Sequence, residues 1–177
     1  MIMKKTLLLG CSLLFCTTLS ANKDSVKLAG DILYGLIPLG SYASTFYMDD
    51  SEGRKEFYKS LGVATGVSYG LKYIIDAPRP DGSDNNSFPS GHTTLTFASA
   101  VFLHKRYGWK SALPAYIGAS FVGFSRVYSN EHYSRDVIAG AVIGGLSAWF
   151  FTDEDENIKI SFKTDEGKRV FFVGYKW

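Results

Sequence analysis

Residues 71–80 read LKYIIDAPRP, residues 88–92 read FPSGH, and residues 125–136 read SRVYSNEHYSRD. Apolar runs with helical spacing separate these three stretches, which together hold histidines, basic side chains and a carboxylate. Such a set is suited to binding a phosphate and breaking a bond to it. The candidate site residues are Lys72, Arg79, Ser90, Gly91, His92, Arg126, His132 and Asp136.

The pair His132 and Asp136 is the first candidate for catalysis. Residues four apart on a helix lie on one face, one turn apart. A carboxylate in that place can hold one imidazole nitrogen and leave the other free to attack. Taken alone, the same spacing also fits an ion pair on a helix surface.

His92 is the second candidate, because it follows Gly91 at the expected start of a helix. The first backbone N–H groups of a helix lack partners and suit an anion. Ser90 and Gly91 would offer those amides with little bulk, and His92 could protonate a leaving oxygen. On its own, this stretch also fits an ordinary helix cap with a surface histidine.

Lys72, Arg79 and Arg126 supply positive charge. Guanidinium groups match phosphate oxygens in pairs, and a lysine adds a point charge. Each of the three could instead extend its stem to water. Two histidines, three cations and a glycine-containing helix start are together hard to explain as solubility, so the combination favours a phosphate site.

Apolar periodicity predicts one domain that is nearly all helical. We expect helices over residues 26–48, 57–75, 91–105, 111–126 and 132–151. The intervening segments are rich in charge, proline or glycine, which is typical of turns.

Glycines and the C-terminal tail add two further expectations. Gly62, Gly66 and Gly70 form a small-residue stripe that would let another helix approach closely. Residues 158–162 and 169–177 alternate in polarity around a turn, which predicts a β-hairpin. We expect this tail, residues 153–177, to pack on the helical domain of residues 21–152.

Residues 1–20 have the features of an export signal. Lys4 and Lys5 precede a short apolar centre, and small residues precede a cut before Ala21. Both cysteines lie in this segment, so a cleaved protein would have neither cysteine chemistry nor cysteine-bound metal. The net charge of +2 gives no sign of a nucleic-acid partner, and nothing predicts the oligomeric state.

The three stretches resemble the signature of the type 2 phosphatidic acid phosphatase family, whose superfamily includes acid phosphatases and vanadium haloperoxidases. The pattern is Lys72-x6-Arg79-Pro80, then Pro89-Ser90-Gly91-His92, then Ser125-Arg126-x5-His132-x3-Asp136, complete and in order over about the central third of the chain. The resemblance implies that family's all-helical bundle. Two departures are a short loop between Pro80 and Pro89, and five helices, without residues 1–20, where membrane members typically have six.

The resemblance also implies a role for each residue. His132 would attack phosphorus and form a phosphohistidine, Asp136 would orient His132, and His92 would protonate the departing alkoxide and later activate water. No metal or other cofactor is needed in the phosphatases of this family, and the motifs hold cations where a metal site would need carboxylates. The residues implied to bind the phosphoryl oxygens are Lys72, Arg79, Ser90, Gly91 and Arg126.

Two locations in a bacterial envelope remain open. If residues 1–20 stay in place as a first span, six helices alternate across the inner membrane, with the basic turns on one side and the motifs on the other. The apolar run of residues 93–103 is short for a hydrocarbon core of about 30 Å. We therefore favour an exported bundle at a periplasmic membrane face; either arrangement places the site outside the cytoplasm.

The favoured function is a metal-independent phosphatase acting on a membrane lipid phosphate. The family implies phosphatidic acid, phosphatidylglycerophosphate, undecaprenyl pyrophosphate or lipid A as candidates. The alternative is a periplasmic acid phosphatase with broad specificity for soluble monoesters. A vanadate-dependent haloperoxidase and a non-enzymatic envelope protein are more distant possibilities.

Overall fold

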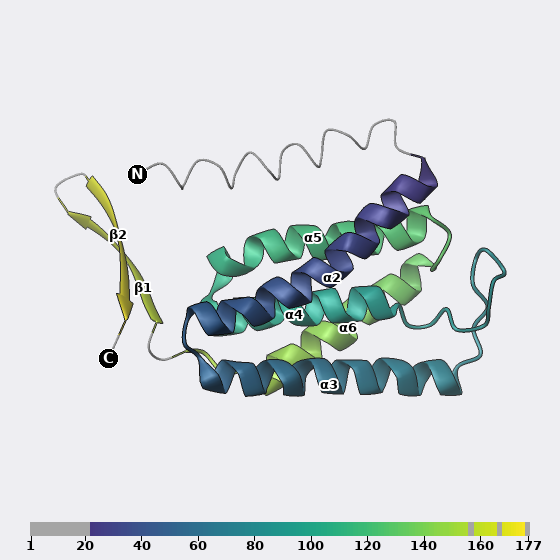
Figure 1. Cartoon of the computed structure of the whole chain (residues 1–177), viewed down its shortest axis with the longest axis horizontal. Coiled ribbons are helices and arrows are strands. Elements are labelled where there is room, and N and C mark those ends of the chain that lie inside the picture. The colour runs from purple at the N-terminus through teal and green to yellow at the C-terminus, as the bar shows by residue number, and fades with distance from the viewer. Residues whose placement is uncertain (1–21, 156–157, 166–167, 176–177) are drawn as a thin grey trace.

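A computed structural model describes residues 22–155, 158–165 and 168–175 of the 177-residue chain. The predicted helical bundle is confirmed, with five helices in these residues (Figure 1). The elements are α2 (Lys23–Tyr47), α3 (Ser51–Ile74), α4 (Gly91–Tyr107), α5 (Trp109–Tyr128), α6 (Ser134–Phe151), β1 (Ile158–Asp165) and β2 (Lys168–Tyr175). The predicted export signal, residues 1–20, lies outside the described residues.

Helix α3 differs most from its predicted range, because it begins at Ser51 and not at Phe57. The Asp50 side chain accepts a hydrogen bond from the Gly53 N–H at 2.8 Å and so caps the helix. The charged segment expected to be a turn is therefore the first helical turn. Within α2, Pro38 lies inside one continuous helix.

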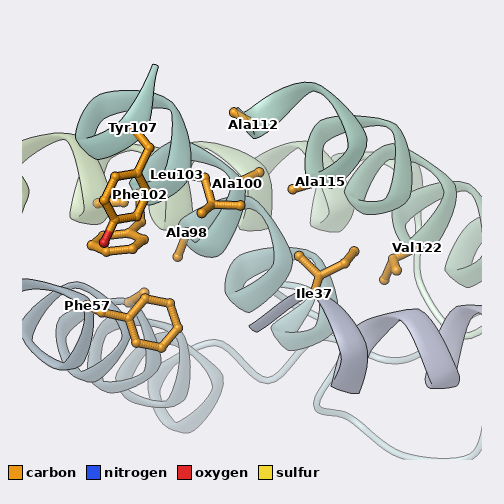
Figure 2. Close-up of a cluster of buried hydrophobic side chains, with 12 residues drawn as sticks. Ile37, Phe57, Ala98, Ala100, Phe102, Leu103, Tyr107, Ala112, Ala115 and Val122 are labelled. Carbon is orange, nitrogen blue, oxygen red and sulfur yellow. The ribbon is translucent and has the colours of Figure 1, made fainter. Parts of the chain in front are cut away.

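Helix α4 is the centre of the bundle, since it contacts α2, α3, α5 and α6. In Figure 1 it lies between α2 and α5 on one side and α3 on the other. Its apolar residues meet those of its neighbours in the main core cluster, and Phe57 and Phe102 pack edge to face with ring centroids 5.0 Å apart (Figure 2). The stretch of α4 from residue 98 to residue 107 is thereby held by several helices.

Close helix contact occurs at glycines of α6, not at those of α3. A Cβ on Gly144 would lie 2.0 Å from the Thr94 carbonyl oxygen, and one on Gly140 would lie 2.5 Å from the Ser90 carbonyl oxygen. Within the described residues, nothing lies within 4 Å of a Cβ built on Gly62, Gly66 or Gly70. The predicted close approach along α3 is therefore wrong, whereas the glycines of α6 bring its start against the start of α4.

Strands β1 and β2 pair antiparallel, with Ile158 opposite Tyr175 and Asp165 opposite Lys168. The packing of this tail on the helices, and the boundaries at residues 20 and 152, stay predictions. Over the part of the chain that the structure describes, no helix combines the length and hydropathy of a membrane span.

Candidate active site

The three motifs meet at a pocket of about 180 Å³ among α2, α3, α4 and the segment before α6. Lys72 comes from the last turn of α3, and Arg79 from the loop that follows. Gly91 and His92 come from the first turn of α4, and His132 from the α5–α6 connection. Both histidines, two of the three predicted cations and the helix start therefore surround one hollow.

The loop after α3 is held in a folded-back shape that presents Arg79. The Arg79 N–H donates to the Asp84 carbonyl oxygen at 2.9 Å, and its Nε donates to the Asp84 carboxylate at 2.7 Å. Lys72 donates to the carbonyl oxygen of Asn86 in the same loop. The short loop thus fixes both cations beside the pocket.

A tight turn after α5 positions His132. Asn130 has a φ of 61°, a left-handed conformation that asparagine tolerates better than most residues. The N–H groups of Glu131 and His132 then both donate to the Arg126 carbonyl oxygen, at 2.9 and 3.2 Å. His132 is only 3% exposed, so its ring lies against the pocket and away from bulk water.

Asp136 is fully buried and ties the motifs together. Its Oδ2 accepts from the Ser87 hydroxyl at 2.5 Å and from the Tyr133 N–H at 3.0 Å, and its carbonyl oxygen accepts from the Ser90 N–H at 3.0 Å. His132 Nδ1 lies 3.7 Å from Oδ2, which is ion-pair distance and longer than a hydrogen bond. Among the described residues, no hydrogen bond of good geometry reaches His132 Nδ1 or Asp136 Oδ1, although the Ser87 backbone faces the imidazole and Arg135 Nε lies 3.5 Å from Oδ1.

The surroundings keep His132 neutral. Burial, followed by the charges of Arg79 and Lys72, lowers its pKa to about 4, although Asp136 acts in the opposite direction. Burial and then the positive charge of Arg79 also lower the pKa of Lys72. A neutral, desolvated imidazole beside two cations suits a nucleophile that attacks an anionic phosphate.

His92 is held from α2. Its Nε2 lies 3.3 Å from Asp31 Oδ1, and its ring centroid lies 4.2 Å from that of Tyr34. Burial, followed by the charge of Arg126, lowers the pKa of His92, whereas Asp31 raises it. The His92 ring lines the same pocket as His132.

Three of the predicted site residues do not line the pocket: Ser90, Arg126 and Asp136. The Ser90 N–H is occupied by the Asp136 carbonyl oxygen, so this amide is not free for an anion as predicted. Arg126 is 1% exposed and donates to Asp31 at 2.8 Å and to the Lys27 carbonyl oxygen at 2.8 Å. Phosphate binding by Arg126 stays a prediction that requires these contacts to change.

Sequence reasoning missed three residues that hold the site. Asp31 contacts His92 and Arg126, Glu131 pairs with Arg79 at 3.0 Å, and Ser87 holds Asp136. Asp31 carried a signal, since it is a carboxylate within an apolar helical pattern. Glu131 directly precedes a motif histidine, whereas Ser87 lies in a polar loop with no distinguishing feature.

No cluster of three or more His, Cys, Asp or Glu side chains in the described segments could hold a metal ion. The acidic residues near the pocket are instead paired with its cations, as with Asp84 and Glu131 around Arg79. Metal-independent chemistry stays a prediction.

Comparisons with known proteins identify the family of the chain. A family model described as the PAP2 superfamily matches residues 56–157. A lipid A 1-phosphatase of Porphyromonas gingivalis is 41% identical over 101 residues, 54% of this chain and 23% of that protein. A lipid A 4'-phosphatase of Helicobacter pylori is 32% identical over 134 residues, 70% of this chain and 67% of that protein. The chain thus spans less than a quarter of the first relative's length.

The fold is also shared with a solved structure. The crystal structure of Aquifex aeolicus LpxE aligns with a TM-score of 0.64 at 20% identity, over 80% of this chain and 93% of that one. This likeness confirms the bundle architecture that the three motifs implied.

Proposed function

Because the chain belongs to the PAP2 superfamily, we propose that it is a phosphatase that hydrolyses a lipid phosphate through a phosphohistidine on His132. The observation that carries the proposal is the pocket itself. It brings a neutral, buried His132, a second histidine and two cations around a space of about 180 Å³.

The chemistry proceeds in two balanced steps. A nitrogen of His132 attacks phosphorus as the ester P–O bond breaks, and protonated His92 gives its proton to the departing alkoxide. Water then attacks phosphorus as the P–N bond breaks, His92 takes a proton from that water, and inorganic phosphate leaves. Since His132 Nδ1 is the nitrogen nearest Asp136, Nε2 is the nucleophilic atom.

Lys72 and Arg79 bind the phosphoryl oxygens and stabilise charge in the transition state. Arg79 pairs with Asp84 in the loop and with Glu131 before α6, and its side chain remains 18% exposed at the pocket. The first-turn amides of α4 after Ser90 add a further anion site at Gly91. Asp136 lies 3.7 Å from His132 Nδ1, where its carboxylate orients the neutral ring and stabilises the positive charge that forms on attack.

Two observations favour a lipid over a soluble substrate. The pocket is small compared with the roughly 300–1,000 Å³ of sites that enclose drug-sized ligands, so it takes the phosphate and leaves the remainder outside. Apolar side chains stand exposed near its edge, since Tyr73 is 94% and Ile74 is 76% exposed beside Lys72. An acyl chain can cover such residues.

The outer faces of two helices extend this apolar surface. Exposed apolar residues recur at intervals of four, four and three on α2 and again on α6. They are Leu28, Ile32, Leu36 and Leu39 on α2, and Ile138, Val142, Leu146 and Trp149 on α6. We place the protein at a membrane face of the bacterial envelope on this basis.

A substrate panel tests the proposal. Phosphatidic acid, phosphatidylglycerophosphate, undecaprenyl pyrophosphate and lipid A in mixed micelles are compared with AMP, and phosphate release is measured with wild type and His132→Ala. We expect a higher kcat/KM for at least one lipid than for AMP, lost in the variant. Equal or greater activity on AMP would replace the lipid substrate with soluble monoesters, and no release from any substrate would overturn the phosphatase.

A further inference from the structure

Asp31 joins two site residues that come from different helices. It lies on α2, and its Oδ1 is 3.3 Å from His92 Nε2 on α4 and accepts from an Arg126 guanidinium nitrogen on α5 at 2.8 Å. The Arg126 side chain is 2% exposed, whereas that of Asp31 is 40% exposed. One carboxylate oxygen therefore connects an imidazole that lines the pocket to a buried cation behind it.

We propose that Asp31 is the positioning residue of His92, holding its Nε2 so that the ring stays in place as the proton donor to the leaving group. This inference rests on the proposed phosphatase function and adds to it a residue outside the three motifs. It gives each histidine of the pocket a carboxylate neighbour, Asp31 for His92 and Asp136 for His132.

The contacts around Asp31 are those of a fixed support. Arg126 holds the carboxylate from one side and is itself anchored on α2 by the Lys27 carbonyl oxygen at 2.8 Å. Tyr34, three residues after Asp31 and so on the same face of α2, packs its ring against His92 at a centroid distance of 4.2 Å. Helix α2 thus supplies both a wall and an acceptor for the imidazole.

The approach of α2 to Arg126 is built into the chain at Gly30. A Cβ at this position would lie 2.0 Å from the Ser125 hydroxyl oxygen and 2.7 Å from an Arg126 guanidinium nitrogen. Only a residue without a side chain lets the backbone come so near. The contact that presents Asp31 therefore depends on the residue directly before it.

The charge of Asp31 acts on the His92 pKa in the direction that a proton donor needs. Burial and then Arg126 lower the pKa of His92, whereas Asp31 and Glu131 raise it. Removing the Asp31 charge should therefore lower the pKa of His92 further and reduce its protonated fraction at any given pH. The charged or titratable groups that face His92 or share its pocket are Asp31, Tyr34, Tyr69, Lys72, Arg79, Arg126, Glu131 and His132.

Leaving groups of different basicity separate positioning of a proton donor from a merely structural role. An alkoxide leaves poorly without a proton, whereas p-nitrophenolate leaves without help. Weakening the proton donor therefore slows hydrolysis of an alkyl phosphate more than that of p-nitrophenyl phosphate. A general loss of folding or of phosphate binding slows both alike.

The test compares Asp31→Asn with Asp24→Asn, which alters an exposed carboxylate on the same helix. We expect Asp31→Asn to lower kcat/KM, which reports the steps up to departure of the leaving group, by roughly 10- to 100-fold for phosphatidic acid and by less than about threefold for p-nitrophenyl phosphate. The alkaline limb of its pH profile should move to lower pH, and Asp31→Glu should recover part of the loss. Asp24→Asn should match wild type, and the melting temperature is recorded for each variant.

Three outcomes would overturn the role of Asp31 while the phosphatase function stands. The first is an active wild type with equal losses of kcat/KM on both substrates in Asp31→Asn. The second is a His92 pKa, followed by NMR of the imidazole, that stays unchanged in Asp31→Asn. The third is a further loss when Asp31→Asn is added to His92→Ala. An inactive wild type would instead overturn the proposed function.

Discussion

Ionisable side chains gather at both ends of helix α4. Those at the C-terminal end are fully hydrogen-bonded, whereas those at the N-terminal end are not. At its C-terminal end, Arg106 donates to both oxygens of Asp50, each at 2.7 Å, and to Glu56 at 3.3 Å. Asp50 also accepts from the Tyr107 hydroxyl at 2.8 Å and caps α3 through the Gly53 N–H. Both oxygens of this carboxylate are thus bonded more than once.

The N-terminal end leaves its polar groups incompletely bonded. In the described residues, His132 Nδ1 and Asp136 Oδ1 are buried without a hydrogen-bond partner, and burial with nearby cations lowers the pKa of His132. At the other end burial raises the pKa of Asp50, but hydrogen bonds led by that from Arg106 outweigh it and hold the pKa low. A cluster whose hydrogen bonds are all made stabilises the fold. A buried histidine and carboxylate with unmade hydrogen bonds remain available for catalysis.

Replacing His132 should give the largest difference between the two ends. We expect His132→Ala to lower kcat by at least about 10⁴-fold, roughly 5 kcal/mol of transition-state stabilisation, because the nucleophile is lost. The melting temperature should stay near that of wild type, since Nδ1 of this ring has no hydrogen bond in the described structure. Turnover within tenfold of wild type would contradict the assignment; kcat and thermal melting measure the two quantities.

Replacing Arg106 should do the reverse. Arg106→Gln leaves Asp50 and Glu56 buried without their cation, which should cost about 3–5 kcal/mol of unfolding free energy in urea titrations. Activity per folded molecule should remain that of wild type. The matched change Lys59→Gln on the exposed face of α3 should alter stability by less than about 0.5 kcal/mol. Equal stability of the two variants would show that the cluster does not stabilise the fold.

The glycines that flank α4 sharpen the contrast at smaller amplitude. Gly108 has a φ of 86° and a ψ of 165°, so Gly108→Ala should cost about 1–3 kcal/mol of stability and leave KM unchanged. A Cβ on Gly91 meets nothing within 4 Å in the described chain, so Gly91→Ala should keep its stability. Because Gly91 lines the pocket, the KM of the Gly91→Ala variant should rise by roughly tenfold or less. A loss of stability in Gly91→Ala together with a raised KM in Gly108→Ala would contradict this assignment of the two ends.

The pH dependence of kcat/KM tests the depressed pKa values. His132 attacks in its neutral form, and its pKa of about 4 keeps it neutral as pH falls towards that value. His92 donates in its protonated form, and its pKa is lowered below the ordinary 6.5, so activity falls as pH rises through that lowered value. We expect a maximum on the acid side of neutrality and a tenfold loss per unit below about pH 4. An acid limb near 6.5 would contradict the burial effect on His132.

Of the two ends of α4, only the site at the N-terminal end could be predicted from the sequence. The combination of side-chain types singles out His132, His92, Lys72 and Arg79, and the resemblance to a known signature implies their roles. The structure places all four at one pocket. Local patterning likewise predicts the helices, because apolar periodicity and caps are short-range features.

Contacts between distant residues could not be predicted. Arg106 lies between two predicted helices in a segment expected to be a turn, and its partners Asp50 and Glu56 lie some 50 residues earlier in the chain. The support of His92 by Asp31 is likewise set by the packing of α2, not by any spacing. The close contact between α6 and α4 depends on which glycines of α6 face α4. The sequence does not distinguish these glycines from those of α3.

The most direct test of the central claim is to isolate the phosphorylated enzyme. His92→Ala slows release of phosphate but still allows p-nitrophenolate to leave, so it should accumulate the intermediate. After reaction with ³²P-labelled p-nitrophenyl phosphate and an alkaline quench, peptide mapping should find acid-labile label on His132, and none in His92→Ala/His132→Ala. A burst of p-nitrophenol without label on His132, or with label on another residue, would contradict the account.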